Sequence, residues 1–254
     1  MSVRPPVTAP TTYGDPSSSS YWTEDPSGLV DLSHPKHPSP KKNVLEFEVS
    51  GERRVRIEAG ATALVVIDMQ KLREEGVLVV WLNWGLKEAE ISGLPASLSR
   101  CFSKPKLGKP VDPPGFGHDL GNGHGRILLR GEWNAKLYGP LEDEWERNKD
   151  KDAWVNKNRM SGFAGVRGSE LELELAKRGM RTLLFAGVNA DQCVLGTVTE
   201  SFSRGYDTIV VEDLVATTSP DGAKSNLIFN ALHCYGFVAN SEQLKQMKRV
   251  QMNE

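Results

Sequence analysis

Residues 183–216 read LLFAGVNADQCVLGTVTESFSRGYDTIVVEDLVA and contain a strand, a helix and a second strand in that order. The apolar runs at 182–188 and 207–213 are short and continuous, which is typical of strands buried on both faces. The segment between them, 193–205, has the apolar spacing of a helix and ends at Gly205. A helix of this length joins parallel neighbours by a right-handed crossover. The stretch therefore predicts one β–α–β unit of a parallel sheet.

The chain repeats this alternation on both sides of the opening stretch. Apolar runs at 63–67, 77–82 and 153–157 predict further strands, and helices are expected after Ser169 and Asp221. Strands and helices that alternate in this way pack as a sheet between two helix layers. We therefore expect an α/β fold, a three-layer α/β/α arrangement with a mostly parallel sheet.

Three segments differ in composition. Residues 1–42 are rich in Pro, Ser, Thr and Gly and lack hydrophobic periodicity, which predicts a disordered tail. Residues 43–60 alternate apolar and polar side chains around Ser50 and Gly51, which predicts an N-terminal β-hairpin. Residues 61–254 are expected to form the α/β domain.

The composition narrows the classes of function. The 254 residues carry a net charge of −2, with 39% hydrophobic and 25% charged side chains, as in a globular domain with a sizeable core. The chain has no large excess of positive charge, so its composition does not favour a nucleic acid or a membrane as partner. Apolar runs fall short of the roughly twenty residues of a bilayer span, and the N-terminal region lacks the core of a signal peptide. We therefore expect a cytoplasmic protein.

Three polar residues follow predicted strands and carry reactive groups: Asp68, Lys157 and Cys193. In parallel sheets, ligands bind at the carboxyl ends of the strands. A thiol near a helix N-terminus is favoured as the nucleophilic thiolate, Asp68 could take its proton, and Lys157 could balance the charge. Each residue also has an ordinary alternative role, as a helix cap, a solvated lysine or a small core side chain.

Three sequence blocks together resemble the isochorismatase-like cysteine hydrolases. The blocks are VVIDMQ at 65–70, KNRMSGF at 157–163 and the opening stretch, and the resemblance covers about 61–244. It implies the same fold, with the three polar residues named above as a catalytic triad.

The resemblance also implies an oxyanion site and a reaction. A cis peptide bond falls on Val188–Asn189, and the backbone N–H groups of Asn189 and Cys193 would bind the oxyanion. Members with this cysteine are mostly amidases of small amides, ureides or carbamoyl compounds, whereas isochorismatases proper can lack it. The run at 226–244 is similar, more loosely, to the ureidoacrylate amidohydrolase and biuret hydrolase branch. No cofactor is implied, and a homo-oligomer is expected.

Further candidates lie at the end of the second predicted strand. Asn83 and Trp84 leave this strand where an amide and an aromatic face could hold a small planar substrate, and Phe163 is a third candidate. Alternatively, Trp84 only packs under the long Gly- and Pro-rich loop that follows. His118 and His124 in that loop match no metal-ligand spacing, so no metal is expected.

The connection between the first two strands is unusually short. Only residues 68–76 lie between them, whereas parallel neighbours need about a dozen residues or more. Members of the family that the chain resembles have a loop and a long helix at this point, so the resemblance implies an internal deletion after Gln70 with the first crossover helix largely missing, and one face of the sheet is expected to lose its cover. Two classes of function stay open: an active small-amide hydrolase, or a weak or inactive relative that serves as an oligomer subunit or binding protein.

Overall fold

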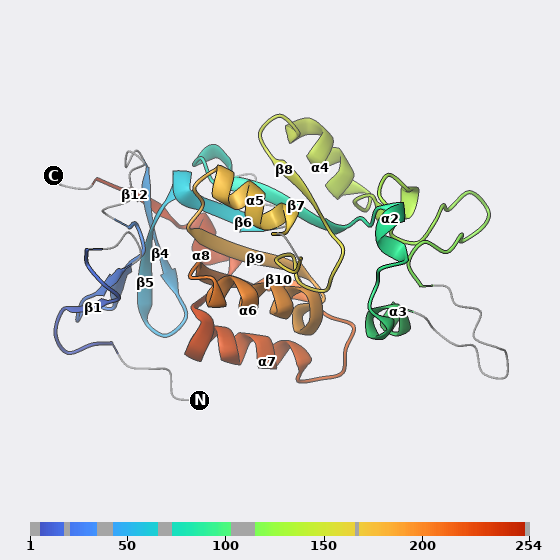
Figure 1. The fold of residues 1–254 in the computed structure, drawn as a ribbon. Helices are drawn as coiled ribbons and strands as arrows, with labels where there is room; N and C mark the ends of the chain where they lie inside the picture. Colours follow the sequence, from blue (N-terminus) through green and yellow to red (C-terminus); the bar gives the residue numbers. More distant parts are fainter. Residues whose placement is uncertain are drawn as a thin grey trace. The chain divides into compact units, whose positions relative to one another are not determined.

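The computed structural model describes residues 6–17, 21–34, 43–65, 73–102, 115–165 and 168–251 (Figure 1). The chain divides into two compact units, Met1–Val80 with Leu175–Glu254, and Trp81–Glu174. The second unit is thus inserted into the sequence of the first. Within the described ranges, no helix is long and apolar enough to cross a membrane.

The first unit contains a parallel sheet. Its strands are β6 (Thr62–Val65), the start of β7 (Leu78–Trp84), β9 (Thr182–Val188), β10 (Asp207–Ala216) and β11 (Phe237–Ala239). They lie in the order β11-β10-β9-β6-β7, and each neighbouring pair is parallel. The predicted α/β fold with a mostly parallel sheet is confirmed, including both strands of the opening stretch.

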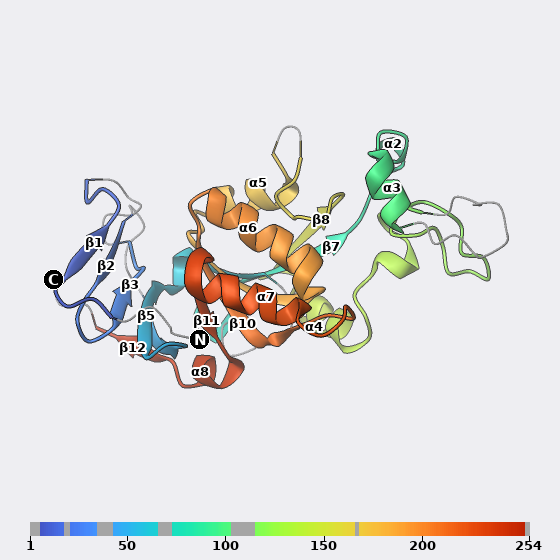
Figure 2. The ribbon, with the colours of Figure 1, turned by 90° about the horizontal axis from the view of Figure 1, so that it is seen from below.

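Two helices cover one face of this sheet. Helices α6 (Leu195–Ser203) and α7 (Ala223–Asn230) run side by side, as the two views show (Figures 1 and 2). Both helices contact β10. Val198 of α6 and Leu227 of α7 are completely buried. Each helix therefore turns an apolar side chain inward, as the amphipathic spacing predicts.

The short connection between β6 and β7 keeps the two strands parallel. Ala63 pairs with Leu78 and Val65 with Val80, but most of the connection, residues 66–72, lies outside the described residues. The apolar residues of β6 and of the described start of β7 are all buried. The described residues of these two strands therefore do not form the uncovered apolar face that the short connection predicts.

A second sheet completes the first unit. Its strands are β1 (Thr11–Tyr13), β2 (Trp22–Glu24), β3 (Leu29–Asp31), β4 (Val44–Val49), β5 (Arg53–Glu58) and β12 (Lys248–Val250). They lie in the order β1-β2-β3-β5-β4-β12. β4 and β5 pair antiparallel around Ser50 and Gly51, as the alternating pattern predicts. Helix α8 (Ser241–Lys245) contacts both β4 and β10, so it links the two sheets.

The first three strands lie in described parts of the segment 1–42, residues 6–17 and 21–34, for which the composition predicts a disordered tail. β3 pairs in parallel with β5, and the side chains of Val30 and Leu32 are buried. The side chain of His34 contacts Asp207, at the start of β10, with 2.5 Å between Nε2 and Oδ2. These partners lie far along the chain, so the local composition of the segment could not reveal them.

The second unit is built around the end of β7. Strand β8 (Ala153–Lys157) is its neighbour in the sheet, and Trp81 of β7 donates from Nε1 to the buried carboxylate of Asp152 at 2.8 Å. The helices of this unit are α2 (Glu88–Ile91), α3 (Ala96–Phe102), α4 (Pro140–Asn148) and the start of α5 (Glu170–Lys177). Ser169 caps α5, as predicted, by accepting the N–H of Glu172 at 3.0 Å.

Candidate active site

Cys193 lies in a tight turn at the carboxyl end of β9. The strand ends at Val188, the Val188–Asn189 peptide bond is cis, and a single π-helical turn, η3 (Ala190–Val194), follows before α6 begins. The carbonyl of Asn189 accepts the N–H of Val194 at 3.2 Å. Cys193 is partly exposed. The thiol therefore sits before the first turn of α6, within the backbone turn that the sequence places at a strand's carboxyl end.

Two side-chain hydrogen bonds hold this turn. Thr197 of α6 donates to the carbonyl of Cys193 at 2.7 Å, and Thr217, just after β10, donates to the carboxylate of Asp191 at 2.5 Å. Hydrogen bonds from Thr217 and then Ser219 lower the pKa of Asp191 below its ordinary value. Asp191 therefore carries a charge at neutral pH and ties the cysteine turn to the segment after β10.

The sequence reasoning missed this contact between Asp191 and Thr217. A usable signal was present, because Thr217 directly follows a buried strand, as the three candidate catalytic residues do. Carboxyl ends of parallel strands share one edge of a sheet, so polar residues after β9 and β10 are expected to meet.

Lys157 ends β8 in the second unit and is only 7% exposed. Its Nζ donates to the carbonyls of Arg159 and Met160, both at 3.1 Å. The same Nζ lies 3.6 Å from the centroid of the Trp84 ring. The alternative of a solvated lysine is therefore wrong, because the ammonium group is fixed by two carbonyls and an aromatic face.

Trp84 belongs to a cluster of aromatic side chains. Its ring centroid lies 5.1 Å from that of Phe102 and 4.9 Å from that of Phe116, which belongs to the long Gly- and Pro-rich loop. Trp84 therefore packs against that loop as well as against Lys157. Asn83 beside it has a buried Nδ2 without a partner among the described residues. Phe163 is completely buried, as a core side chain is. Contact of these three residues with substrate stays a prediction.

A cavity of about 350 Å³ opens at the end of β8. Asn156, Lys157 and Asn158 line it together with the ion pair of Arg130 and Glu170, whose atoms Nη2 and Oε1 are 2.8 Å apart. Burial by itself would raise the pKa of Glu170, but hydrogen bonds from Arg130 and from the N–H of Asn156 outweigh it and lower the pKa. The cavity therefore presents fixed charges of both signs beside the predicted catalytic lysine.

The predicted triad is described only in part. Asp68 lies outside the described residues, while Lys157 and Cys193 each have a defined environment within their own unit. The triad and the oxyanion site therefore stay predictions. The ring of His124 lies against Trp133, with centroids 5.3 Å apart. Among the residues with described positions, no group of three or more His, Cys, Asp and Glu side chains could hold a metal ion.

Known proteins match most of this chain. The family model of the isochorismatase domain matches residues 62–243. A ureidoacrylate amidohydrolase, RutB, from Caulobacter vibrioides (strain ATCC 19089 / CIP 103742 / CB 15) is 31% identical over 208 residues, which cover 78% of this chain and 79% of that protein. RutB from Pseudomonas savastanoi pv. phaseolicola is 25% identical over 211 residues, which cover 73% of this chain and 83% of that protein.

Solved structures show the same fold at lower identity. A cysteine hydrolase from Pseudomonas syringae pv. phaseolicola 1448A superposes with a TM-score of 0.55 at 17% identity, covering 73% of this chain and 91% of that chain. An isochorismatase family protein from Desulfovibrio vulgaris subsp. vulgaris str. Hildenborough superposes with a TM-score of 0.54 at 21% identity, covering 73% of this chain and 96% of that chain.

Proposed function

The chain belongs to the isochorismatase family, and on that premise we propose that it is a cysteine hydrolase that cleaves a C–N bond of a small amide, ureide or carbamoyl compound. The observation that carries the proposal is the position of Cys193, a partly exposed thiol in the turn between β9 and α6. This turn stands at the carboxyl end of a parallel strand, where such sheets bind ligands.

The proposed reaction has two steps through a thioester. The sulfur of Cys193 attacks the substrate carbonyl, Asp68 takes the thiol proton, and the same proton passes to the nitrogen that leaves. The N–H groups of Asn189 and Cys193 bind the oxygen that becomes negative. Water then attacks the thioester and gives a proton to Asp68, the carbon–sulfur bond breaks, and Asp68 returns this proton to the sulfur of Cys193 as the acid leaves.

Lys157 has an electrostatic role in this proposal. Its burial and its two carbonyl acceptors fix the ammonium group in one place. A positive charge that is fixed and sheltered from water stabilises a carboxylate or a developing oxyanion more than a mobile, solvated positive charge does. We therefore assign Lys157 to holding Asp68 ionised and to stabilising charge during acylation.

A ureide is the substrate class that we favour. The curated relatives at 25% and 31% identity are named ureidoacrylate amidohydrolases. A planar ureide offers a carbonyl to the thiol, and both an amide such as Asn83 and an aromatic face such as Trp84 suit it. The expected cytoplasmic location and homo-oligomer belong to this proposal.

A second candidate function rests on the short connection between β6 and β7. If the segment 66–72 does not bring Asp68 to the thiol, the protein would be a weak or inactive family member that acts as an oligomer subunit or binding protein.

Intact mass after rapid mixing with ureidoacrylate tests both candidates. We expect an added acyl mass on the parent protein, and neither an adduct nor turnover in Cys193→Ala. Cys234→Ala, which removes an exposed cysteine elsewhere, should behave as the parent. Turnover that persists in Cys193→Ala would refute the nucleophile, and absence of both adduct and turnover across small amides would favour the second candidate.

A further inference from the structure

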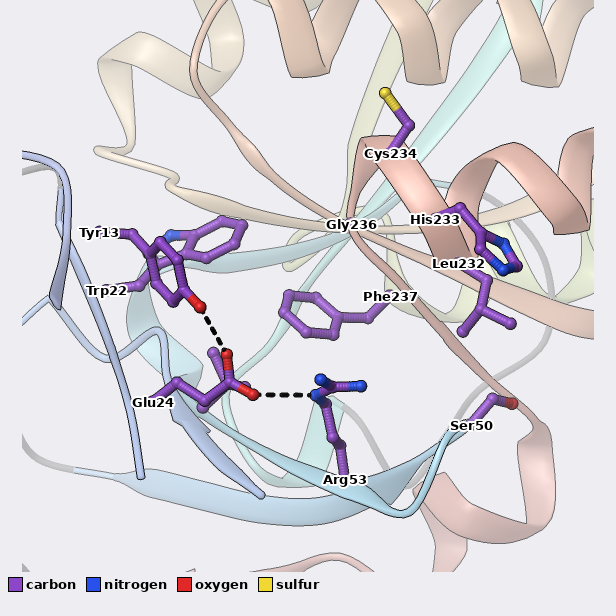
Figure 3. A pocket seen from close by; sticks show the side chains of 11 residues that line it. Tyr13, Trp22, Glu24, Ser50, Arg53, Leu232, His233, Cys234, Gly236 and Phe237 are labelled. Atoms are coloured by element: carbon purple, nitrogen blue, oxygen red, sulfur yellow. Dashed lines mark hydrogen bonds and ion pairs between the residues drawn. The ribbon is translucent and has the colours of Figure 1, made fainter. Parts of the chain in front are cut away.

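The first unit contains a cavity that shares no lining residue with the proposed catalytic site. Its volume is about 180 Å³, and it lies between the N-terminal strands and the segment from the π-helical turn η4 (Ala231–Tyr235) to β11 (Figure 3). Tyr13, Trp22 and Phe237 supply aromatic walls, and Glu24 and Arg53 a polar end. We propose that this cavity binds a small, neutral, planar molecule that carries a carbonyl group.

The aromatic walls are held in place without a ligand. The rings of Trp22 and Phe237 have centroids 5.6 Å apart. Trp22 donates from Nε1 to the carboxylate of Asp207 at 2.7 Å. This carboxylate also accepts the hydroxyl of Thr182 at 3.1 Å and lies 2.5 Å from His34 Nε2. Because Asp207 is buried and held on several sides, the Trp22 ring is fixed, which lowers the entropy cost of binding.

The polar end of the cavity is a buried ion pair. Arg53 Nε donates to Glu24 Oε1 at 3.1 Å, and the Tyr13 hydroxyl donates to Glu24 Oε2 at 3.0 Å. The side chains of Arg53 and Glu24 are 9% and 6% exposed. In Figure 3 Glu24 meets Arg53 at Nε, and one terminal amino group of Arg53 points away from Glu24. A guanidinium has five N–H donors, so Arg53 can serve Glu24 and a ligand acceptor together.

Size and charge select the class of ligand. A cavity of about 150 Å³ suffices for a benzene-sized ring, so this one admits a six-membered ring with a small substituent. Planar rings pack well against aromatic walls. Glu24 already balances the charge of Arg53, so an anionic ligand would add an uncompensated charge to a buried site. An amide or lactam carbonyl accepts a hydrogen bond without that cost.

Photolabelling of the full-length protein tests this proposal. The probe is 4-azidobenzamide, and the labelled peptides are identified by mass spectrometry. We expect label on the peptides that contain Trp22 or Phe237, and at least a tenfold reduction by excess benzamide. The anionic analogue 4-azidobenzoate should label these peptides at least tenfold less at equal concentration. Cys193→Ala should label as the parent does, so the result is independent of the proposed hydrolase activity.

A matched pair of variants controls for the position. Ser50 lines the cavity and is half-buried, so Ser50→Phe should fill it and reduce labelling at least tenfold. Glu48→Phe introduces the same side chain at an exposed position of β4 and should keep parental labelling. Thermal melting checks that both variants are folded. Labelling that benzamide does not compete, or that Ser50→Phe retains, would overturn the proposal. Competed label confined to the Cys193 or Lys157 peptides would overturn it as well.

Discussion

Replacing Trp84 with leucine removes the ring that lies against the ammonium group of Lys157. The Nζ atom is 3.6 Å from the ring centroid, and Lys157 is 7% exposed, so the contact is largely desolvated and contributes about 2 kcal/mol. The ring also contacts Phe102 and Phe116, and each aromatic pair adds about 0.5–1.5 kcal/mol. We therefore expect Trp84→Leu to lower the free energy of unfolding by about 3–5 kcal/mol.

A double-mutant cycle with Lys157→Met separates the charge from the packing. Urea unfolding of the parent, the two single variants and the double variant should give a coupling energy of about 2 kcal/mol. Trp133→Leu is the control, because this tryptophan of the same unit is 62% exposed and its loss should change stability by no more than about 0.5 kcal/mol. A coupling energy below about 0.5 kcal/mol would refute the reasoning, since the ammonium group would then not sense the ring.

Two further predictions concern the first unit. Hydrogen bonds, first of all from Thr217, lower the pKa of Asp191 from its ordinary value of 3.8. Their contribution to the stability of the fold is therefore fully present above pH 3.8, and it is lost as the pH falls through the lowered pKa. The rate of amide exchange in the turn that carries Cys193, corrected for intrinsic rates, should therefore be constant from about pH 5 to 8 in the parent. In Asp191→Asn this exchange should be faster than in the parent over the whole range. Equal rates in the two proteins would contradict this prediction. Asp207→Ala removes the acceptor of Trp22 Nε1 and of the Thr182 hydroxyl and the partner of His34, and each buried donor left without an acceptor costs about 1–3 kcal/mol, so limited proteolysis should cut the N-terminal strands faster than in the parent, and unchanged protection would count against it.

The elements that local pattern determines could be predicted from the sequence. β9, α6 and β10 follow directly from two apolar runs and an amphipathic segment between them. The end of β8 at Lys157 and the cap of α5 by Ser169 follow from strand and helix-start signals. In each case the deciding residues lie within about a dozen positions of one another, so no knowledge of the tertiary structure is needed.

The features that depend on distant partners could not be predicted. β2 is stabilised by the contact of Trp22 with Asp207, which lies 185 positions further along the chain. The burial of Lys157 depends on Trp84, which belongs to another strand. Composition and periodicity describe only the neighbourhood of a residue, so they place Trp22 in a polar tail and leave a solvated Lys157 open as an alternative to a catalytic one.

The insertion of the second unit at 81–174 also determines the order in which the chain can fold during synthesis. Strand β6 and the start of β7 leave the ribosome early, but β9, the other neighbour of β6, follows only after the whole inserted unit. Until then β6 presents one unpaired backbone edge and the fully apolar side chains of Ala63, Leu64 and Val65. A nascent chain in this state is a target for intermolecular strand pairing. Slow synthesis of residues 81–174 would therefore lower the yield of native protein without changing its final stability.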